Sequence, residues 1–188
     1  VAKGMFGISS LPDSVWKWSV ESHLLRKGRR QVNYEYKYSD VGYLFLKRIA
    51  EKLLNQPMNE FLEQNFYLPL GASTLTYLPL QKFPESRIAP TEDDKDFRRQ
   101  LVRGRVHDQG AAMMGGIAGH AGLFSNANDL AKVLQMNLNN GFYGGERYLK
   151  ENTLHKFTQR QKAGNRRGLG WDKPALEYDG QTSAHSSV

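Results

Sequence analysis

The sequence predicts an α+β fold in which helices dominate and strands are few and short. Two segments, 39–55 and 125–141, carry capping residues at their starts and apolar residues at helical spacing. Extended patterns are confined to short stretches rich in tyrosine, proline or glycine, which favours small strands beside a helical body. At 188 residues, with 39% hydrophobic and 24% charged residues, the chain is long enough for one domain with a core, or for part of a larger domain.

Composition and the two ends of the chain limit the classes of protein to consider. No apolar run approaches the roughly 18 residues that a membrane-spanning helix needs, so we expect no membrane span. The absence of cysteine excludes disulfides, thiolate metal ligands and a cysteine nucleophile within these residues. The start Val1-Ala2-Lys3-Gly4 resembles neither a signal peptide nor a natural start, and residues 182–188 lack periodicity. We therefore expect a single partial domain over residues 1–188, a fragment of a larger one.

The formal charge of +7 at pH 7 suits an anionic partner such as nucleic acid, a cell-wall polymer or an acidic surface. The basic residues form three short groups, at 26–30, 98–105 and 166–167, separated by acidic runs such as 92–94. Because none of these groups is interleaved with aromatic residues in a nucleic-acid-binding pattern, we interpret them as solvated faces and expect no nucleic-acid partner.

The first predicted helix contains a pattern that resembles a catalytic motif. The helix opens at residues 11–14, where Pro12 suits an early helical position, and closes at Gly28, with Val15, Trp18 and Leu25 along one face. Ser14 and Lys17 form a Ser-x-x-Lys pattern, the arrangement in which a lysine activates a serine nucleophile. Such short patterns arise by chance, and a serine in a first helical turn most simply caps it, so we interpret Ser14 as structural.

The stretch around Tyr38 carries the most suggestive chemistry in the chain. Tyrosines at 34, 36 and 38 have the spacing of a short strand, and Ser39 and Asp40 are placed to cap the helix that follows. A phenol at a helix N-terminus lies where backbone N–H groups favour negative charge, which suits a tyrosinate. The alternative is a capped helix behind an aromatic packing residue. The broad apolar side of this helix is predicted to be buried.

The middle of the chain alternates short helices with irregular segments. Pro57 is expected to start a short helix that ends at residues 67–71. Three prolines and many polar residues argue against regular structure from 78 to 94, apart from an extended piece at 87–91. The glycine-rich stretch 106–124 allows sharp turns or close backbone approach, but its spacing matches no nucleotide-binding fingerprint. We expect no cofactor.

The C-terminal part contains the clearest helix signal. Ser125 is placed to cap this helix, Asp129 lies early in it, and Gly141 follows its end. Its apolar side comprises Leu130, Val133, Leu134 and Leu138. A turn at 143–147, a short helix at 151–158 and an extended segment starting at Gly168 complete the prediction.

Four ordered segments together resemble the serine beta-lactamase and penicillin-binding-protein group, and most closely its class C, esterase and DD-peptidase-like branch. These segments are Tyr38-Ser39-Asp40 with Val41-Gly42-Tyr43, Tyr67-Leu68-Pro69-Leu70-Gly71 with Thr76, Gly119-His120-Ala121-Gly122-Leu123-Phe124-Ser125 with Asp129-Leu130-Ala131, and Gly168-Leu169-Gly170-Trp171. Their order and separation, over roughly residues 34–171, make the likeness specific. The resemblance implies mainly the helical lobe of a beta-lactamase/transpeptidase-like fold.

The resemblance also implies a serine acyl-transfer mechanism, in which a Ser-x-x-Lys serine attacks an amide, ester or lactam carbonyl. In this branch the tyrosine of a Tyr-x-Asn motif handles the proton of the nucleophile, and here that tyrosine is Tyr38, the candidate catalytic residue. Nearby cations favour the tyrosinate form of a phenol, which then serves as a base. Ser39 and Asp40 are candidate substrate-binding residues that line the cleft.

The sequence departs from the family pattern in three places. Asp40 stands where the family usually has asparagine, and an ionised carboxylate cannot donate a hydrogen bond to a substrate carbonyl. Ser14 is much closer to Tyr38 than the family nucleophile is to its tyrosine. The segment His185-Ser186-Ser187 lacks the glycine of a Lys/His-Ser/Thr-Gly third motif. We therefore expect the isolated chain to lack an identifiable nucleophile and to be inactive.

His120 is a further candidate substrate-binding residue. The resemblance implies that its glycine-rich turn approaches the cleft, where an imidazole can titrate near neutral pH or bind substrate. The alternative is a turn histidine that bonds to backbone. A metal site with His107 and Asp108 is a weaker possibility, because the spacing matches no ligand signature and the sequence places no obvious second carboxylate. We therefore expect no metal.

Two functional hypotheses follow. The first is a fragment of a serine hydrolase that acts on a small-molecule or cell-wall peptide substrate, in a bacterial protein located in the periplasm or otherwise outside the cytoplasm by family resemblance. The second, motivated by Asp40, is a catalytically silent binding or accessory domain that keeps the fold and the cleft. The sequence leaves the oligomeric state open.

Overall fold

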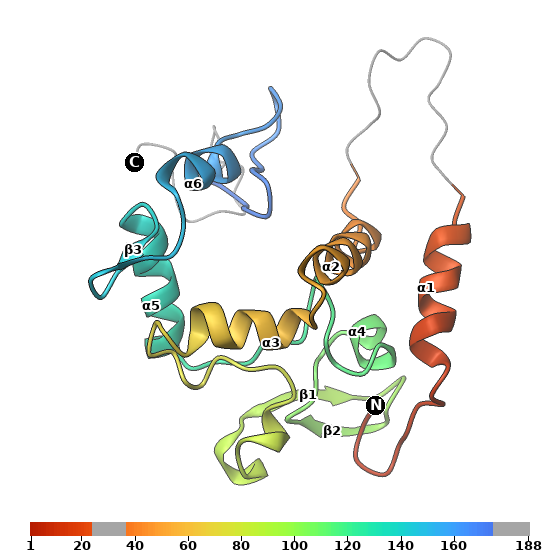
Figure 1. The fold of residues 1–188 in the computed structure, drawn as a ribbon. Helices are drawn as coiled ribbons and strands as arrows, with labels where there is room; N and C mark the ends of the chain where they lie inside the picture. Colours follow the sequence, from red (N-terminus) through yellow and green to blue (C-terminus); the bar gives the residue numbers. More distant parts are fainter. Residues whose placement is uncertain (24–36, 175–188) are drawn as a thin grey trace. The chain divides into compact units, whose positions relative to one another are not determined.

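The computed structural model describes residues 1–23 and 37–174, and within them it contains six α-helices and four short strands (Figure 1). The predicted α+β class with few short strands is confirmed. The helices are α1 (Leu11–Glu21), α2 (Val41–Leu54), α3 (Met58–Leu62), α4 (Gln109–Met113), α5 (Ala127–Leu138) and α6 (Glu151–Thr158). The strands β1 (Pro90–Asp94) and β2 (Gln100–Arg103) form one antiparallel pair, and β3 (Phe142–Tyr143) and β4 (Glu146–Arg147) form another.

The chain divides into two compact units, Val1–Asp129 and Leu130–Val188. The candidate site residues all lie in the first unit. None of the described helices is long and apolar enough to cross a membrane.

Helix α1 is shorter than the sequence pattern predicts. It ends at Glu21, because Ser22 turns to extended backbone with φ −62° and ψ 139°. Val15 is buried as expected, but Trp18 is exposed. Gly28, Leu25, the basic group at 26–30 and the tyrosines at 34 and 36 lie outside the described residues.

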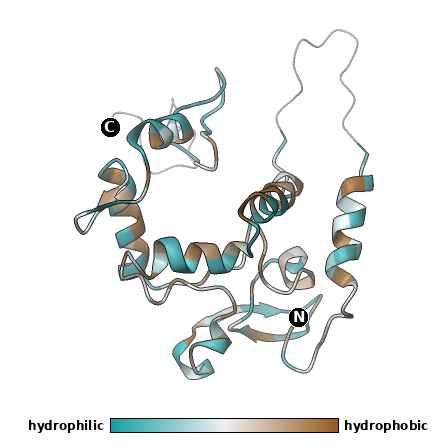
Figure 2. Cartoon of the chain, in the orientation of Figure 1, coloured by the Kyte–Doolittle hydropathy of each residue, from teal (hydrophilic) through white to brown (hydrophobic). Residues whose placement is uncertain are grey.

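Helix α2 has nearly the predicted bounds, but the predicted burial of its broad apolar side is wrong. Figure 2 shows hydrophobic residues along α2. Leu44 is buried against the core, whereas Leu46, Ile49 and Leu53 are exposed. Within the described residues, helices α1 and α3 pack against α2. An aromatic contact between Trp16 and Phe45, with ring centroids 4.9 Å apart, joins α1 to α2.

The core of the first unit is built largely around α4, a helix that the glycine-rich sequence does not reveal. Asp108 caps α4, since its Oδ1 accepts the N–H of Ala111 at 2.6 Å. Ala111 and Ala112 are buried, and their small side chains allow neighbouring segments to approach closely. The core cluster comprises Val15, Leu44, Val106, Ala111, Ala112 and Ala118.

The segment between α3 and β2 is more regular than the sequence suggests. Pro57 precedes α3 as predicted, and one π-helical stretch, Glu63–Tyr67, continues it. Short 3-10 turns occupy Pro79–Gln81 and Glu85–Arg87, so the extended piece begins at Pro90 rather than at residue 87.

Arg98 lies in the connection between β1 and β2, and its guanidinium is fully buried. Its Nε donates to Asp94 at 2.7 Å and its Nη2 to Glu92 at 2.6 Å. The same guanidinium donates to the carbonyls of Val106 and His107, each at 2.6 Å. The interpretation of the basic group at 98–105 as a solvated face is therefore wrong for Arg98. Its partners are the acidic residues of β1, and together they hold the segment that leads to Asp108.

Helix α5 begins with a cap supplied by Asn126 rather than by Ser125. The side-chain oxygen of Asn126 accepts the N–H of Asp129 at 2.8 Å. The Asp129 carboxylate in turn accepts two hydrogen bonds from Thr74, from its N–H at 2.8 Å and its hydroxyl at 2.6 Å. Of the four residues on the predicted apolar side, Leu130, Leu134 and Leu138 are exposed and Val133 is half-buried. The buried residue of this part of the helix is Met136.

The hairpin and the last helix of the second unit follow the prediction closely. Helix α6 has the expected bounds, and a turn at Gly144-Gly145 joins β3 to β4. Residues 168–171 do not form the expected extended segment, because they make a bend closed by a single bridge between Arg167 and Asp172.

Candidate functional site

The start of α2 presents the three residues of the tyrosine motif in different ways. The hydroxyl oxygen of Ser39 accepts the N–H of Val41 at 3.3 Å, so Ser39 supports the first turn. The backbone carbonyl of Asp40 accepts a hydrogen bond from the N–H of Tyr43 at 2.9 Å, but the Asp40 carboxylate makes no capping hydrogen bond. The Asp40 carboxylate is therefore available for other contacts.

Tyr38 precedes the helix and is 75% exposed. An aromatic residue that packs behind a capped helix would be buried, so its exposure argues against the packing alternative. A phenol in this position is accessible to a partner or a substrate. The catalytic role of Tyr38 stays a prediction.

The glycine-rich turn that carries His120 lies directly on the first turn of α2. A Cβ added at Gly119 would meet the backbone oxygen of Tyr43 at 2.2 Å, so only glycine allows this close approach. The contact places His120 near the start of α2, although the two segments are about eighty residues apart in the sequence. This is the close backbone approach that the glycine-rich stretch predicts.

His120 is nearly buried, with 9% of its side chain exposed, and it pairs with Asp108. Its Nε2 lies 2.9 Å from Asp108 Oδ1, while its Nδ1 has no hydrogen-bond partner among the described residues. The alternative of a turn histidine that bonds to backbone is not what the structure shows, because the partner of the imidazole is the Asp108 carboxylate.

One oxygen of Asp108, Oδ1, both pairs with His120 and caps α4. Burial by itself raises the pKa of this carboxyl group. The hydrogen bonds from the Ala111 N–H and His120, with the charges of His120 and His107, outweigh burial and lower the pKa below its usual value. Asp108 is therefore ionised at neutral pH.

Asp40 completes a cluster with Asp108 and His120. One oxygen of each carboxylate and one ring nitrogen of His120 all lie within 4.8 Å of one another. The structure thus brings together Asp40 and His120, two of the predicted site residues. Sequence reasoning missed the part of Asp108, although an aspartate just before an alanine-containing segment is a recognisable N-cap signal.

Ser14 and Lys17 are engaged within their own helix. The Ser14 hydroxyl donates to the carbonyl of Ser10 at 3.1 Å, and the Lys17 ammonium lies 3.9 Å from Glu21. The ammonium therefore lies close to a carboxylate one helical turn ahead. The predicted capping role of Ser14 is wrong, because Ser10 is the N-cap residue and Ser14 lies inside the helix.

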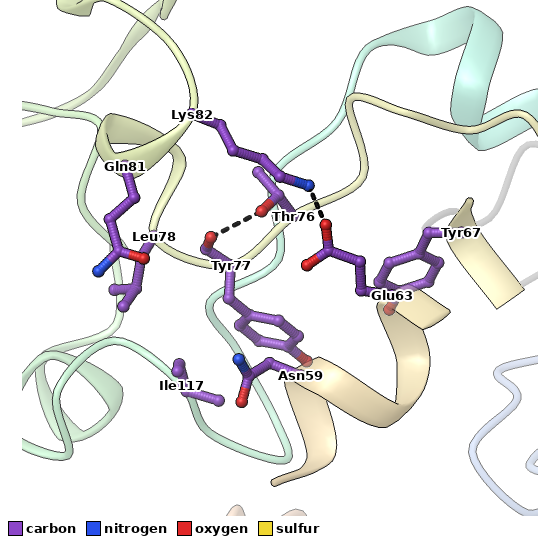
Figure 3. Close-up of a pocket in the computed structure, with 9 residues that line it drawn as sticks. All are labelled: Asn59, Glu63, Tyr67, Thr76, Tyr77, Leu78, Gln81, Lys82 and Ile117. Atoms are coloured by element: carbon purple, nitrogen blue, oxygen red, sulfur yellow. Dashed lines mark hydrogen bonds and ion pairs between the residues drawn. The ribbon is translucent and has the colours of Figure 1, made fainter. Parts of the chain in front are cut away.

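A small cavity in the first unit, of about 70 Å³, lies apart from these residues (Figure 3). An ion pair between Lys82 and Glu63 borders it, and Tyr67 and Tyr77 contribute to its wall. Burial raises the pKa of Tyr67 and of Tyr77, so both phenols stay protonated at neutral pH. None of Tyr38, Ser39, Asp40 and His120 lines this cavity, which we interpret as structural.

Comparison with protein families and curated proteins gives matches over most of the chain. The beta-lactamase family model matches residues 24–186. A protein of Escherichia coli K12 that bears the provisional name D-alanyl-D-alanine carboxypeptidase is 38% identical over 146 residues, which cover 71% of this chain and 34% of the relative. A similarly named protein of Salmonella schwarzengrund has the same identity and coverage. The chain thus spans about a third of the length of the curated relatives it matches.

Solved structures show the same fold. A penicillin-binding protein homologue from Pyrococcus abyssi, described as octameric, aligns with a TM-score of 0.56 at 20% identity, over 82% of this chain and 31% of that one. A provisionally named beta-lactamase from Bacteroides dorei aligns with a TM-score of 0.52 at 18% identity, over 78% of this chain and 34% of that one.

Proposed function

Because the chain belongs to the beta-lactamase family of serine hydrolases, we propose that it is part of an enzyme that cleaves a peptide, ester or lactam substrate through an acyl-enzyme. The names of the curated relatives favour a peptide, and cell-wall peptide in particular. The observation that carries the proposal is the exposed Tyr38, which precedes α2 and lies two residues before Asp40 of the carboxylate–imidazole cluster. This is where the family pattern puts its acid/base tyrosine.

In this proposal Tyr38 accepts the proton of the nucleophilic serine and returns it to the leaving group. The backbone N–H groups in the N-terminal turn of α2 carry partial positive charge, which stabilises negative charge that develops nearby. Ser14 is not the nucleophile, since its hydroxyl donates within α1. We place the nucleophilic serine and the third motif outside residues 1–188, so that the isolated chain is inactive.

Ser39, Asp40 and His120 line the substrate cleft in this proposal. The Asp40 carboxylate accepts hydrogen bonds but donates none, so it suits a substrate N–H group rather than a carbonyl. This preference favours a peptide with an available donor over a lactam held through its carbonyl oxygen. The enzyme is located outside the cytoplasm, where its peptide substrate would be found.

The test uses the intact protein and a serine-reactive fluorophosphonate probe. We expect labelling of the folded protein, and we expect Tyr38→Phe to slow acylation by about 10² to 10⁴-fold, the usual contribution of a general base. Tyr143→Phe in β3 is the matched control, since it removes the same hydroxyl from a residue in the other unit and should leave the rate unchanged. Equal acylation rates for the wild type and Tyr38→Phe would remove Tyr38 from the mechanism.

A catalytically silent accessory domain is the second candidate, and Asp40 is the observation that favours it. Such a protein would keep the family fold but would not react with the probe. The residues encoded upstream offer a direct check, because the accessory role predicts no Ser-x-x-Lys motif there. Absence of labelling in an intact, folded protein would favour this candidate over the enzyme.

A further inference from the structure

The cluster of Asp40, Asp108 and His120 joins three segments that are distant in the sequence. Asp40 begins α2, Asp108 caps α4, and His120 lies in the glycine-rich turn that rests on α2. In the sequence, the spacing of Asp108 and His120 matches no ligand signature, and no second carboxylate is obvious beside them. Asp40 is that second carboxylate.

We propose that Asp40, Asp108 and His120 bind one divalent transition-metal ion of the Zn²⁺ type. Their three ligand atoms lie within 4.8 Å of one another. Zinc is bound at about 2.0–2.2 Å by nitrogen and carboxylate oxygen, which places tetrahedral neighbours about 3.4 Å apart. The exposed carboxylate of Asp40 makes no capping bond, so its side chain can rotate to close the remaining separation.

Electrostatics gives a reason for a cation at this point. A cation placed between two carboxylates is attracted by both of them. His120 supplies a nitrogen that is nine-tenths buried and faces Asp108. In a neutral imidazole one ring nitrogen carries the proton and the other offers its lone pair to a metal, and the Nδ1 of His120 has no hydrogen-bond partner among the described residues.

The ligand set defines the class of metal. One imidazole with two carboxylates suits Zn²⁺ or a neighbouring transition metal, whereas Mg²⁺ and Ca²⁺ prefer oxygen ligands alone. The fourth position of a tetrahedral site would hold water, because Asp40 is exposed and gives solvent access. His107 is not part of the set, since its Nδ1 contacts Glu92 at 2.8 Å.

The test titrates the full chain, stripped with a chelator and free of any histidine tag, with ZnCl₂ in an isothermal calorimeter. We expect one saturable equivalent of Zn²⁺ and much weaker binding of Mg²⁺. Asp40→Asn and His120→Gln should each weaken Zn²⁺ binding at least about tenfold. Asp40→Asn is the decisive variant, because the exposed, uncapped side chain can change without loss of a structural hydrogen bond.

His155→Ala is the matched control, since His155 is an exposed histidine on α6 that lies 3.5 Å from Glu151. Its removal should leave the one-equivalent event unchanged, and circular dichroism should show that every variant remains folded. The proposal is overturned if the chain shows no saturable equivalent of Zn²⁺. It is equally overturned if Asp40→Asn binds Zn²⁺ as tightly as the wild type does.

Discussion

Replacement of Arg98 by methionine should destabilise the first unit more than any surface change can. The side chain is fully buried and donates four hydrogen bonds, two to carboxylates and two to backbone carbonyls. Methionine has a similar length but carries no donor and no charge. The variant therefore leaves one buried carboxylate and the carbonyls of Val106 and His107 without their partner.

The expected cost follows from that loss. Removal of one member of a buried ion pair costs about 3–5 kcal/mol, because the remaining charge stays buried without compensation. Domains have total stabilities of about 5–15 kcal/mol, so Arg98→Met removes a large fraction. For a chain of this size each kcal/mol shifts the melting temperature by about 2–4 °C, which predicts a fall of roughly 6–20 °C.

Urea and thermal unfolding followed by circular dichroism measure this effect. Arg99→Met is the matched control, because Arg99 is the exposed neighbour and undergoes the same change of charge and shape. Its cost should stay within about 0.5 kcal/mol. If both variants unfold at the same urea concentration, the buried guanidinium does not stabilise the fold.

Two further predictions concern the stability of the fold at low pH and the backbone contact between Gly119 and Tyr43. The hydrogen bond from Arg98 lowers the pKa of Asp94 to about 2, against the opposing effect of burial and with help from the N–H groups of Phe97, Arg98 and Asp96. Because the pKa of Asp94 in the folded state is depressed below the usual 3.8, this stabilisation is present above about pH 4 and is lost as the pH falls toward 2. Acid titration should therefore show a steeper loss of stability in the wild type than in Asp94→Asn. Gly119→Ala should cost at least about 1–3 kcal/mol, since the new methyl group would meet the backbone oxygen of Tyr43, whereas Gly42→Ala meets nothing and should be neutral or stabilising by up to about 1 kcal/mol. Similar denaturation midpoints for the two glycine variants would contradict the close approach.

The parts of the fold that sequence reasoning recovered are those determined locally. Helices α2, α5 and α6 carry their apolar periodicity within a few turns, and Gly141 and Pro57 mark boundaries by backbone conformation alone. Helix α4 was not predicted because it is only five residues long and is stabilised by the Asp108 cap and by burial of its alanines.

The candidate site was predictable only in pieces. Tyr38, Ser39 and Asp40 are neighbours in the sequence, so a motif could identify them. The meeting of Asp40 with Asp108 and His120 depends on the close approach at Gly119, and a tertiary contact of this kind has no local signal. For the same reason, the burial of Arg98 within its basic group could not be recognised from the spacing of the group.

The Arg98 cluster also restricts how the sequence can drift over evolutionary time. Loss of any one charge leaves the others uncompensated, so a lineage that changes Arg98, Asp94 and Glu92 singly must pass through a poorly folding intermediate. Joint replacement by apolar residues of similar volume avoids that intermediate. The three positions should therefore be inherited together or exchanged together, even though none of them belongs to the proposed catalytic motif.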